Sequence, residues 1–109
     1  MKVEKIQGVA ILSTDERLDA VFGPKLKDAV KELARESGIK LVLDMEKTSH
    51  IDSSGCGALV ASLKALLKNH GDMKIARPSP QALTLFELTR LHKVFQIYDT
   101  LEGAVESFV

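Results

Sequence analysis

Apolar side chains along this chain follow two periods, one typical of strands and the other typical of helices. Residues 39–45 are almost continuously apolar, which indicates a strand covered on both faces of a sheet. Between Pro24 and Gly38, apolar side chains instead recur every three or four residues, the spacing of an amphipathic helix. We expect this helix to open at Gly23-Pro24, since proline is favoured at the first helical position, and to end at Gly38.

Shorter segments of both kinds fill the rest of the chain. The predicted strands cover residues 3–7 and 9–13, which form a hairpin broken at Gly8, and residues 73–76 and 94–98. The predicted helices cover residues 54–69, residues 80–88 after the capping Ser79, and a terminal segment from Thr100 to near Phe108. Strands that alternate with helices indicate an α/β sheet whose functional loops lie at the carboxyl ends of its strands.

Length and charge narrow the class of protein. The 109 residues make one domain, and 45% of them are apolar, which is enough for a core. Fifteen basic residues balance fifteen acidic ones, which argues against a nucleic-acid partner. No apolar run approaches the roughly 20 residues that span a bilayer, and the N-terminus lacks the apolar region of a secretory signal. With a single cysteine and no membrane span, the chain is expected to be cytoplasmic.

The most informative segment runs from His50 to Leu59. It has the pattern of a strand end, a tight turn with two hydroxyls and the start of a helix. Ser53 and Ser54 therefore fall at a helix N-terminus, where unpaired N–H groups and the helix dipole favour a phosphate. Asp52 stands beside them without an obvious base, so the arrangement suits a phosphorylated target better than an enzyme.

Small side chains follow the two serines. Gly55 and Gly57 would let the backbone of a partner, or a nucleotide, come close. On the helix face expected to be exposed, Gly57, Ala58 and Ala61 leave a bare strip, and we expect a partner to dock there. The alternative is that Ser53 only caps the helix and that the glycines only serve the turn.

The segment Asp52-Ser53-Ser54-Gly55-Cys56-Gly57 resembles the D-S-S-G-L-G signature of STAS domains, the anti-sigma factor antagonist family. More of the chain resembles the family in the same order: Arg17-Leu18-Asp19-Ala20, residues 41–45, residues 88–95 and residues 97–104. The resemblance implies a single STAS-type domain over residues 1–109, an α/β fold with a mixed, mostly parallel sheet of roughly four to five strands and about four helices.

The resemblance also implies a function and a site. In that family a partner anti-sigma kinase phosphorylates the serine after the aspartate, which is Ser53 here, with Ser54 as the second choice. The unphosphorylated protein binds this kinase and so frees a sigma factor, and a PP2C-type phosphatase reverses the modification. We expect a bacterial transcription regulator that is a monomer or weak dimer and uses no cofactor. Its expected partner-binding residues are Asp19, Asp52, Ser53, Ser54, Gly55, Gly57, Ala58 and Ala61.

A few positions depart from the family pattern. Cys56 replaces a leucine and is expected to pack as a small hydrophobe, with a redox-sensitive thiol as the alternative. Glu16 and Arg90 replace glycines, so the turn before Arg17 and the loop around Arg90 are expected to differ from those of the family.

Other functions compete with this interpretation. Ser53, Asp52 and a histidine could imitate a hydrolase triad, but on a strand His50 and Asp52 project to one face and Ser53 projects to the other. Gly55-Cys56-Gly57 is only a fragment of a phosphate loop, so a nucleotide-responsive module is a second alternative. The histidines are too scattered to suggest a metal site. Within the family, a component of another signalling complex or of a lipid-transport complex stays open.

Overall fold

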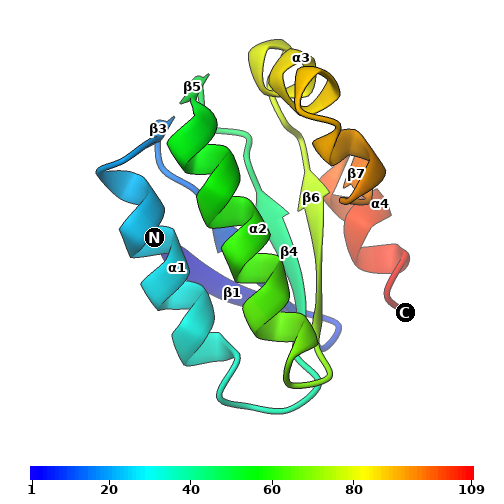
Figure 1. The fold of residues 1–109 in the computed structure, drawn as a ribbon. Helices are drawn as coiled ribbons and strands as arrows, with labels where there is room; N and C mark the ends of the chain where they lie inside the picture. Colours follow the sequence, from blue (N-terminus) through cyan, green and yellow to red (C-terminus); the bar gives the residue numbers. More distant parts are fainter.

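A five-stranded sheet forms the centre of the molecule in the computed structural model, which describes residues 1–109 (Figure 1). Its strands are β1 (Lys2–Ile6), β2 (Val9–Ser13), β4 (Lys40–Asp44), β6 (Asp72–Ala76) and β7 (Ile97–Tyr98), in the order β1-β2-β4-β6-β7. β1 pairs with β2 in the antiparallel sense and every other pair is parallel, so the sheet is mixed and mostly parallel, as predicted. A separate parallel ladder joins β3 (Arg17–Leu18) to β5 (His50–Ile51).

Helices cover both faces of the sheet. α1 (Phe22–Leu33), α2 (Ser53–Leu67) and α3 (Pro80–Leu88) contribute to the larger core on one face, and α4 (Leu101–Glu106) covers the other. In Figure 1, α1 and α2 lie side by side in front of the sheet and run in the same direction. β4 lies between the two layers and is buried from Leu41 to Asp44, which explains its nearly continuous apolar sequence. None of the helices combines the length and the apolar character that crossing a membrane requires.

The predicted segments exist, but several of their ends differ. The C-cap of α1 is Ala34, so Gly38 does not end the helix. Gly38 lies in the turn that leads to β4, where its φ of +77° suits glycine and its N–H donates to the Asn69 carbonyl at 2.9 Å. α2 begins at Ser53, one residue before the predicted start.

The C-terminal elements are shorter than predicted, although their caps are correct. Residues 91–93 form a 3-10 helix, which leaves only Ile97–Tyr98 for the last strand, and α4 ends at Glu106 rather than near Phe108. The hydroxyls of Ser79 and Thr100 accept hydrogen bonds from backbone N–H groups three residues on, at 3.1 and 3.0 Å. Both predicted N-caps are therefore confirmed.

Candidate functional site

The predicted site lies at the carboxyl edge of the parallel strands, where α1 and α2 begin beside each other (Figure 1). The ladder of β3 and β5 places Leu18 opposite Ile51. The residues that follow are Asp19 and Asp52, so the chain leaves each short strand through an aspartate and then enters a helix. The fold thus builds the same strand, aspartate and helix junction twice, side by side.

Asp52, and not Ser53, is the N-cap of α2. Its backbone is extended, with φ −128° and ψ −172°, and its carboxylate accepts a hydrogen bond from the Gly55 N–H at 3.0 Å. Ser53 is already the first helical residue. The alternative that Ser53 serves only as a helix cap is therefore wrong, because the neighbouring aspartate occupies that position.

Both serines of the signature are exposed, and neither hydroxyl makes a hydrogen bond within the domain. The backbone N–H groups of Ser53 and Ser54 also have no acceptor in the domain, as expected for the first turn of a helix. Ser54 lines a shallow hollow together with Asp19 and Lys27, so Asp19 lies beside the serine signature although it is 33 positions or more away in the sequence. The arrangement presents a free hydroxyl and free N–H donors to the solvent.

The two glycines of the signature have opposite surroundings. A Cβ added at Gly55 would lie 2.1 Å from the carbonyl oxygen of Leu18, whereas a Cβ at Gly57 would meet no atom within 4 Å. Gly55 is buried and lets α2 start directly against β3. The prediction that Gly55 admits a partner or a nucleotide is wrong, because the chain itself fills that space. Gly57 is exposed, as predicted.

The predicted bare strip is narrower than the sequence indicates. Ala58 is only 3% exposed, so its assignment to the exposed helix face is wrong. It packs against α1, where a Cβ added at Gly23 would lie 3.2 Å from the Ala58 Cβ. Gly57 and Ala61 are exposed at helical spacing after Ser53, and these three residues define the strip that a partner can reach.

The charge of Asp19 is compensated within the domain. Its carboxylate accepts hydrogen bonds from the N–H groups of Phe22 and Val21, at 3.1 and 3.0 Å, and from the guanidinium of Arg17, whose Nε lies 2.8 Å away. The backbone N–H of Phe22 and the Arg17 guanidinium lower the pKa of Asp19, while its burial opposes them. Asp19 therefore binds the backbone at the start of α1 and lies near the serines, but its negative charge is paired with Arg17 within the domain.

Cys56 packs into the larger core, as predicted for a small hydrophobe. Burial, and to a lesser extent the negative charge of Asp52, raise the pKa of its thiol.

Glu16 and Arg90 stand where the family has glycine, and their backbones differ. Glu16 has no positive φ, whereas Arg90 adopts the left-handed region at φ +63°. Arg90 therefore carries the backbone strain that a glycine would avoid.

Gln81 is a site residue that the sequence did not reveal. Its side-chain amide pairs with the backbone of Ile51, with the Ile51 N–H donating to Oε1 at 3.2 Å and Nε2 donating to the Ile51 carbonyl at 3.0 Å. The amide thus continues the hydrogen bonding of β5 on the side away from β3, directly before Asp52. A glutamine in the first turn of a helix carries no sequence signal for such a contact.

Known proteins resemble this chain over most of its length, in sequence and in structure. The family model described as the STAS domain matches residues 1–104. The anti-sigma-B factor antagonist of Listeria monocytogenes is 31% identical over 80 residues, which cover 73% of this chain and 70% of that protein. The anti-sigma-B factor antagonist of Bacillus subtilis is 30% identical over 89 residues, 82% of this chain and 81% of that protein. The crystal structure of an anti-sigma factor antagonist from Mycobacterium paratuberculosis is 29% identical, with a TM-score of 0.86 over 97% of this chain and 90% of that one.

Proposed function

This chain belongs to the STAS domain family, acts as an anti-sigma factor antagonist and, we propose, exchanges partners through phosphorylation of Ser53. Unphosphorylated, it binds an anti-sigma factor that is also a serine kinase, and this binding frees a sigma factor. A PP2C-type phosphatase returns the phosphorylated protein to the binding form. Because its partner acts on the transcription machinery, we place the protein in the bacterial cytoplasm.

The observation that carries this proposal is the position of Ser53 as the exposed first residue of α2, next to a cap that is already filled. A kinase can reach the hydroxyl without breaking any hydrogen bond of the domain. A phosphate there would lie beside the free N–H groups of Ser53 and Ser54, at the positive end of the helix dipole. The fold should therefore tolerate the modification.

The same phosphate should prevent partner binding. It adds about −1.5 to −2 charges near neutral pH, next to the strip of Ser53, Gly57 and Ala61 and beside the carboxylate of Asp52. Juxtaposed like charges in an interface cost several kcal/mol, and each ~1.4 kcal/mol weakens a complex about tenfold. One phosphoryl group is thus sufficient to dissociate a complex of micromolar affinity.

The proposal is tested with the unmodified chain, ATP and the anti-sigma kinases of the same genome. Mass spectrometry should find the phosphate on Ser53, and calorimetry should show that Ser53→Ala binds the kinase constitutively while Ser53→Asp does not. Ser37→Asp is the matched control, since Ser37 is exposed and lies at the opposite end of α1. Phosphate on neither Ser53 nor Ser54, or equal affinity of Ser53→Asp and the wild type, would contradict the switch.

A further inference from the structure

A groove runs along the outer side of α1 and α2, away from the sheet. It begins at a hollow lined by Ser54, Pro24 and Lys27, and Pro24 and Lys27 also line the next hollow along the helices. A third hollow follows, and it shares Lys31, Ala61 and Ala65 with the second. This third hollow has a volume of about 760 Å³ and ends at Lys68. From Ser54 to Lys68 the groove follows α2 for about 21 Å, at 1.5 Å per residue.

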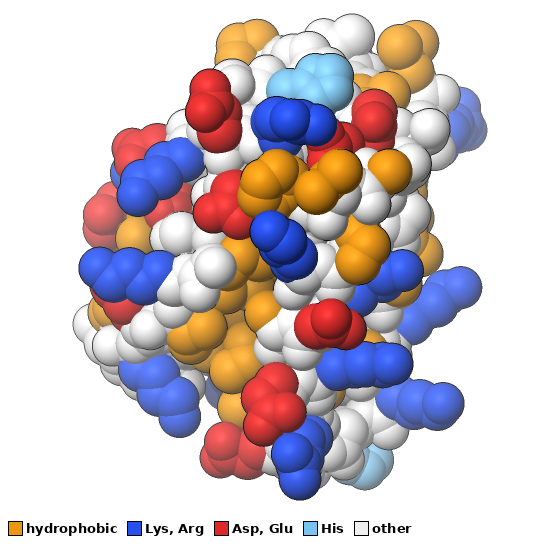
Figure 2. Space-filling model, turned by 90° about the vertical axis from the view of Figure 1, so that its left-hand side faces the viewer, with side chains coloured by type: hydrophobic (Ala, Val, Ile, Leu, Met, Phe, Trp, Pro, Cys, Tyr) orange, Lys and Arg blue, Asp and Glu red, His pale blue; other side chains and the backbone are white.

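Cations form both rims of the wide end of this groove. Lys31 extends from α1 and Arg35 from the turn after it, Lys64 extends from α2 and Lys68 from its C-cap, and no carboxylate lines this part. Figure 2 shows Lys and Arg side chains gathered on its right-hand side, although the whole chain has no net charge. None of these lysines forms an ion pair, and Arg35 contacts only the exposed Glu32, at 3.3 Å.

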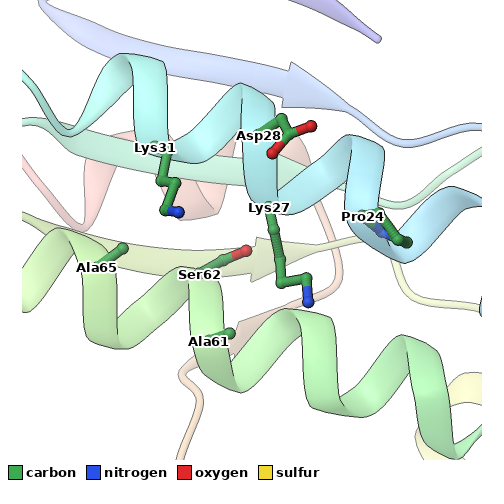
Figure 3. Close-up of a pocket in the computed structure, with 7 residues that line it drawn as sticks. All are labelled: Pro24, Lys27, Asp28, Lys31, Ala61, Ser62 and Ala65. Carbon is green, nitrogen blue, oxygen red and sulfur yellow. The ribbon is translucent and has the colours of Figure 1, made fainter.

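The floor of the groove is apolar and consists mainly of alanine side chains. Ala34, Ala61, Ala65 and the half-exposed Leu67 line it, so a second helix could approach the backbone closely. Figure 3 shows Lys27 and Lys31 reaching from α1 toward α2, and Asp28 is the one carboxylate that lines the middle of the groove. The floor also holds the hydroxyl of Ser62, a buried polar atom with no hydrogen-bond partner in the domain.

From this geometry we propose that the groove binds an acidic amphipathic helix of a partner protein. Small apolar residues of that helix would face Ala61 and Ala65, and its carboxylates would meet the lysines on both rims, the mode in which amphipathic helices occupy grooves. The proposal goes beyond the serine switch, because the cationic surface lies toward the other end of α2 and does not depend on phosphorylation.

The groove suits a helix better than it suits a membrane or a nucleic acid. Asp28 and Glu32 lie on the exposed side of α1, so a continuous anionic bilayer surface would meet these carboxylates, whereas a single helix can place its own carboxylates beside Lys31, Lys64 and Lys68 alone. No aromatic residue lines it, so it offers no platform on which bases could stack.

A synthetic acidic peptide tests the proposal independently of any anti-sigma factor. The probe is an amphipathic helix of about 18 residues, with alanine and leucine on one face and glutamate on the flanks. In an amide NMR titration, shifts should be confined to residues 24–35 and 57–68, and added salt should weaken binding. Neutralising the rims with Lys31→Gln, Lys64→Gln and Lys68→Gln should raise the dissociation constant about tenfold or more.

The controls separate this outcome from general charge attraction. The same charge change at exposed lysines outside the groove, Lys5→Gln, Lys47→Gln and Lys93→Gln, should leave peptide binding unchanged. A peptide with lysine in place of glutamate should not bind. The proposal is overturned if the acidic peptide shifts other residues, binds both triple variants equally or does not bind at all. It is also overturned if phosphatidylglycerol vesicles, and not the peptide, require the rim lysines.

Discussion

Replacing Gly55 or Gly57 by alanine adds the same methyl group two residues apart in one helix, yet the two changes should affect stability in opposite directions. At Gly57 the added Cβ meets no atom within 4 Å. At Gly55 it would lie 2.1 Å from the Leu18 carbonyl oxygen and 2.9 Å from the carbonyl carbon, so α2 or β3 must move. Both atoms of Leu18 belong to the backbone and cannot rotate away.

The magnitudes follow from these surroundings. Gly57→Ala gains the higher helix propensity of alanine, about 1 kcal/mol, and should raise Tm by roughly 4–8 °C in a domain of this size. Gly55→Ala gains the same propensity but forces overpacking, which costs about 1–3 kcal/mol in well-packed interiors and more where backbone must shift. It also separates α2 from the ladder that holds Asp52 against β3. Gly55→Ala should therefore be clearly less stable than the wild type.

Urea denaturation followed by circular dichroism measures both variants against the wild type. Shifted midpoints with unchanged slopes would show that the stability has changed while the surface exposed on unfolding has not. Calorimetry with the anti-sigma factor adds a second readout, since Gly57→Ala should weaken binding by narrowing the exposed strip even though it stabilises the fold. If Gly55→Ala were as stable as the wild type, α2 would not start against the Leu18 carbonyl, and our account of the signature would be wrong.

Two further predictions concern residues that hold the site in place. Gln81→Ala leaves the Ile51 N–H and carbonyl unpaired and should lower the free energy of unfolding by about 1–3 kcal/mol. Gln96→Ala is the control, because Gln96 is exposed and its side chain does not hydrogen-bond to Ile51. Equal urea midpoints for the two variants would exclude the pairing of Gln81 with Ile51. Asp19→Asn should be less stable than the wild type near neutral pH, because a carboxylate whose pKa is lowered in the folded state stabilises the fold above the pKa of the unfolded chain. That contribution is lost as the pH falls through the lower pKa of the folded state. The difference in urea midpoint between Asp19→Asn and the wild type should therefore close below about pH 4. A difference that does not depend on pH would refute the ionic role of Asp19.

The long elements of this fold could be predicted because burial leaves a pattern over many residues. Residues 39–45 lie between two layers and are therefore apolar throughout, and Ser79 and Thr100 are caps that local chemistry alone specifies. β3 has only two residues, too few to show an alternation of apolar and polar side chains, and the sequence indicates its partner β5 only as the end of a strand. The contact of Gln81 with Ile51 spans 30 positions and depends on how α3 is placed against β5.

Within the site, the sequence identified the segment but not the role of each residue. Aspartate and serine are both favoured N-caps, so composition could not decide between Asp52 and Ser53; the extended backbone at Asp52 does. Gly55, Gly57 and Ala58 are all small, and small residues do not reveal which side of a helix is buried. Only their contacts in the fold distinguish them: Gly55 lies against Leu18 and Ala58 against Gly23, whereas Gly57 faces open space.

The capping of α2 by Asp52 has a consequence for how long each form of the protein would last in a cell. If the hydroxyl of Ser53 supported the helix, every phosphorylation would change the folding equilibrium, and proteases would remove one form faster than the other. Because the cap belongs to a neighbouring residue, and because a phosphate on Ser53 would lie at the favourable positive end of the helix, the modified form should be folded at least as well as the unmodified one. Proteases should therefore not remove the phosphorylated form preferentially, and the total amount of the protein should not fall when the kinase is active.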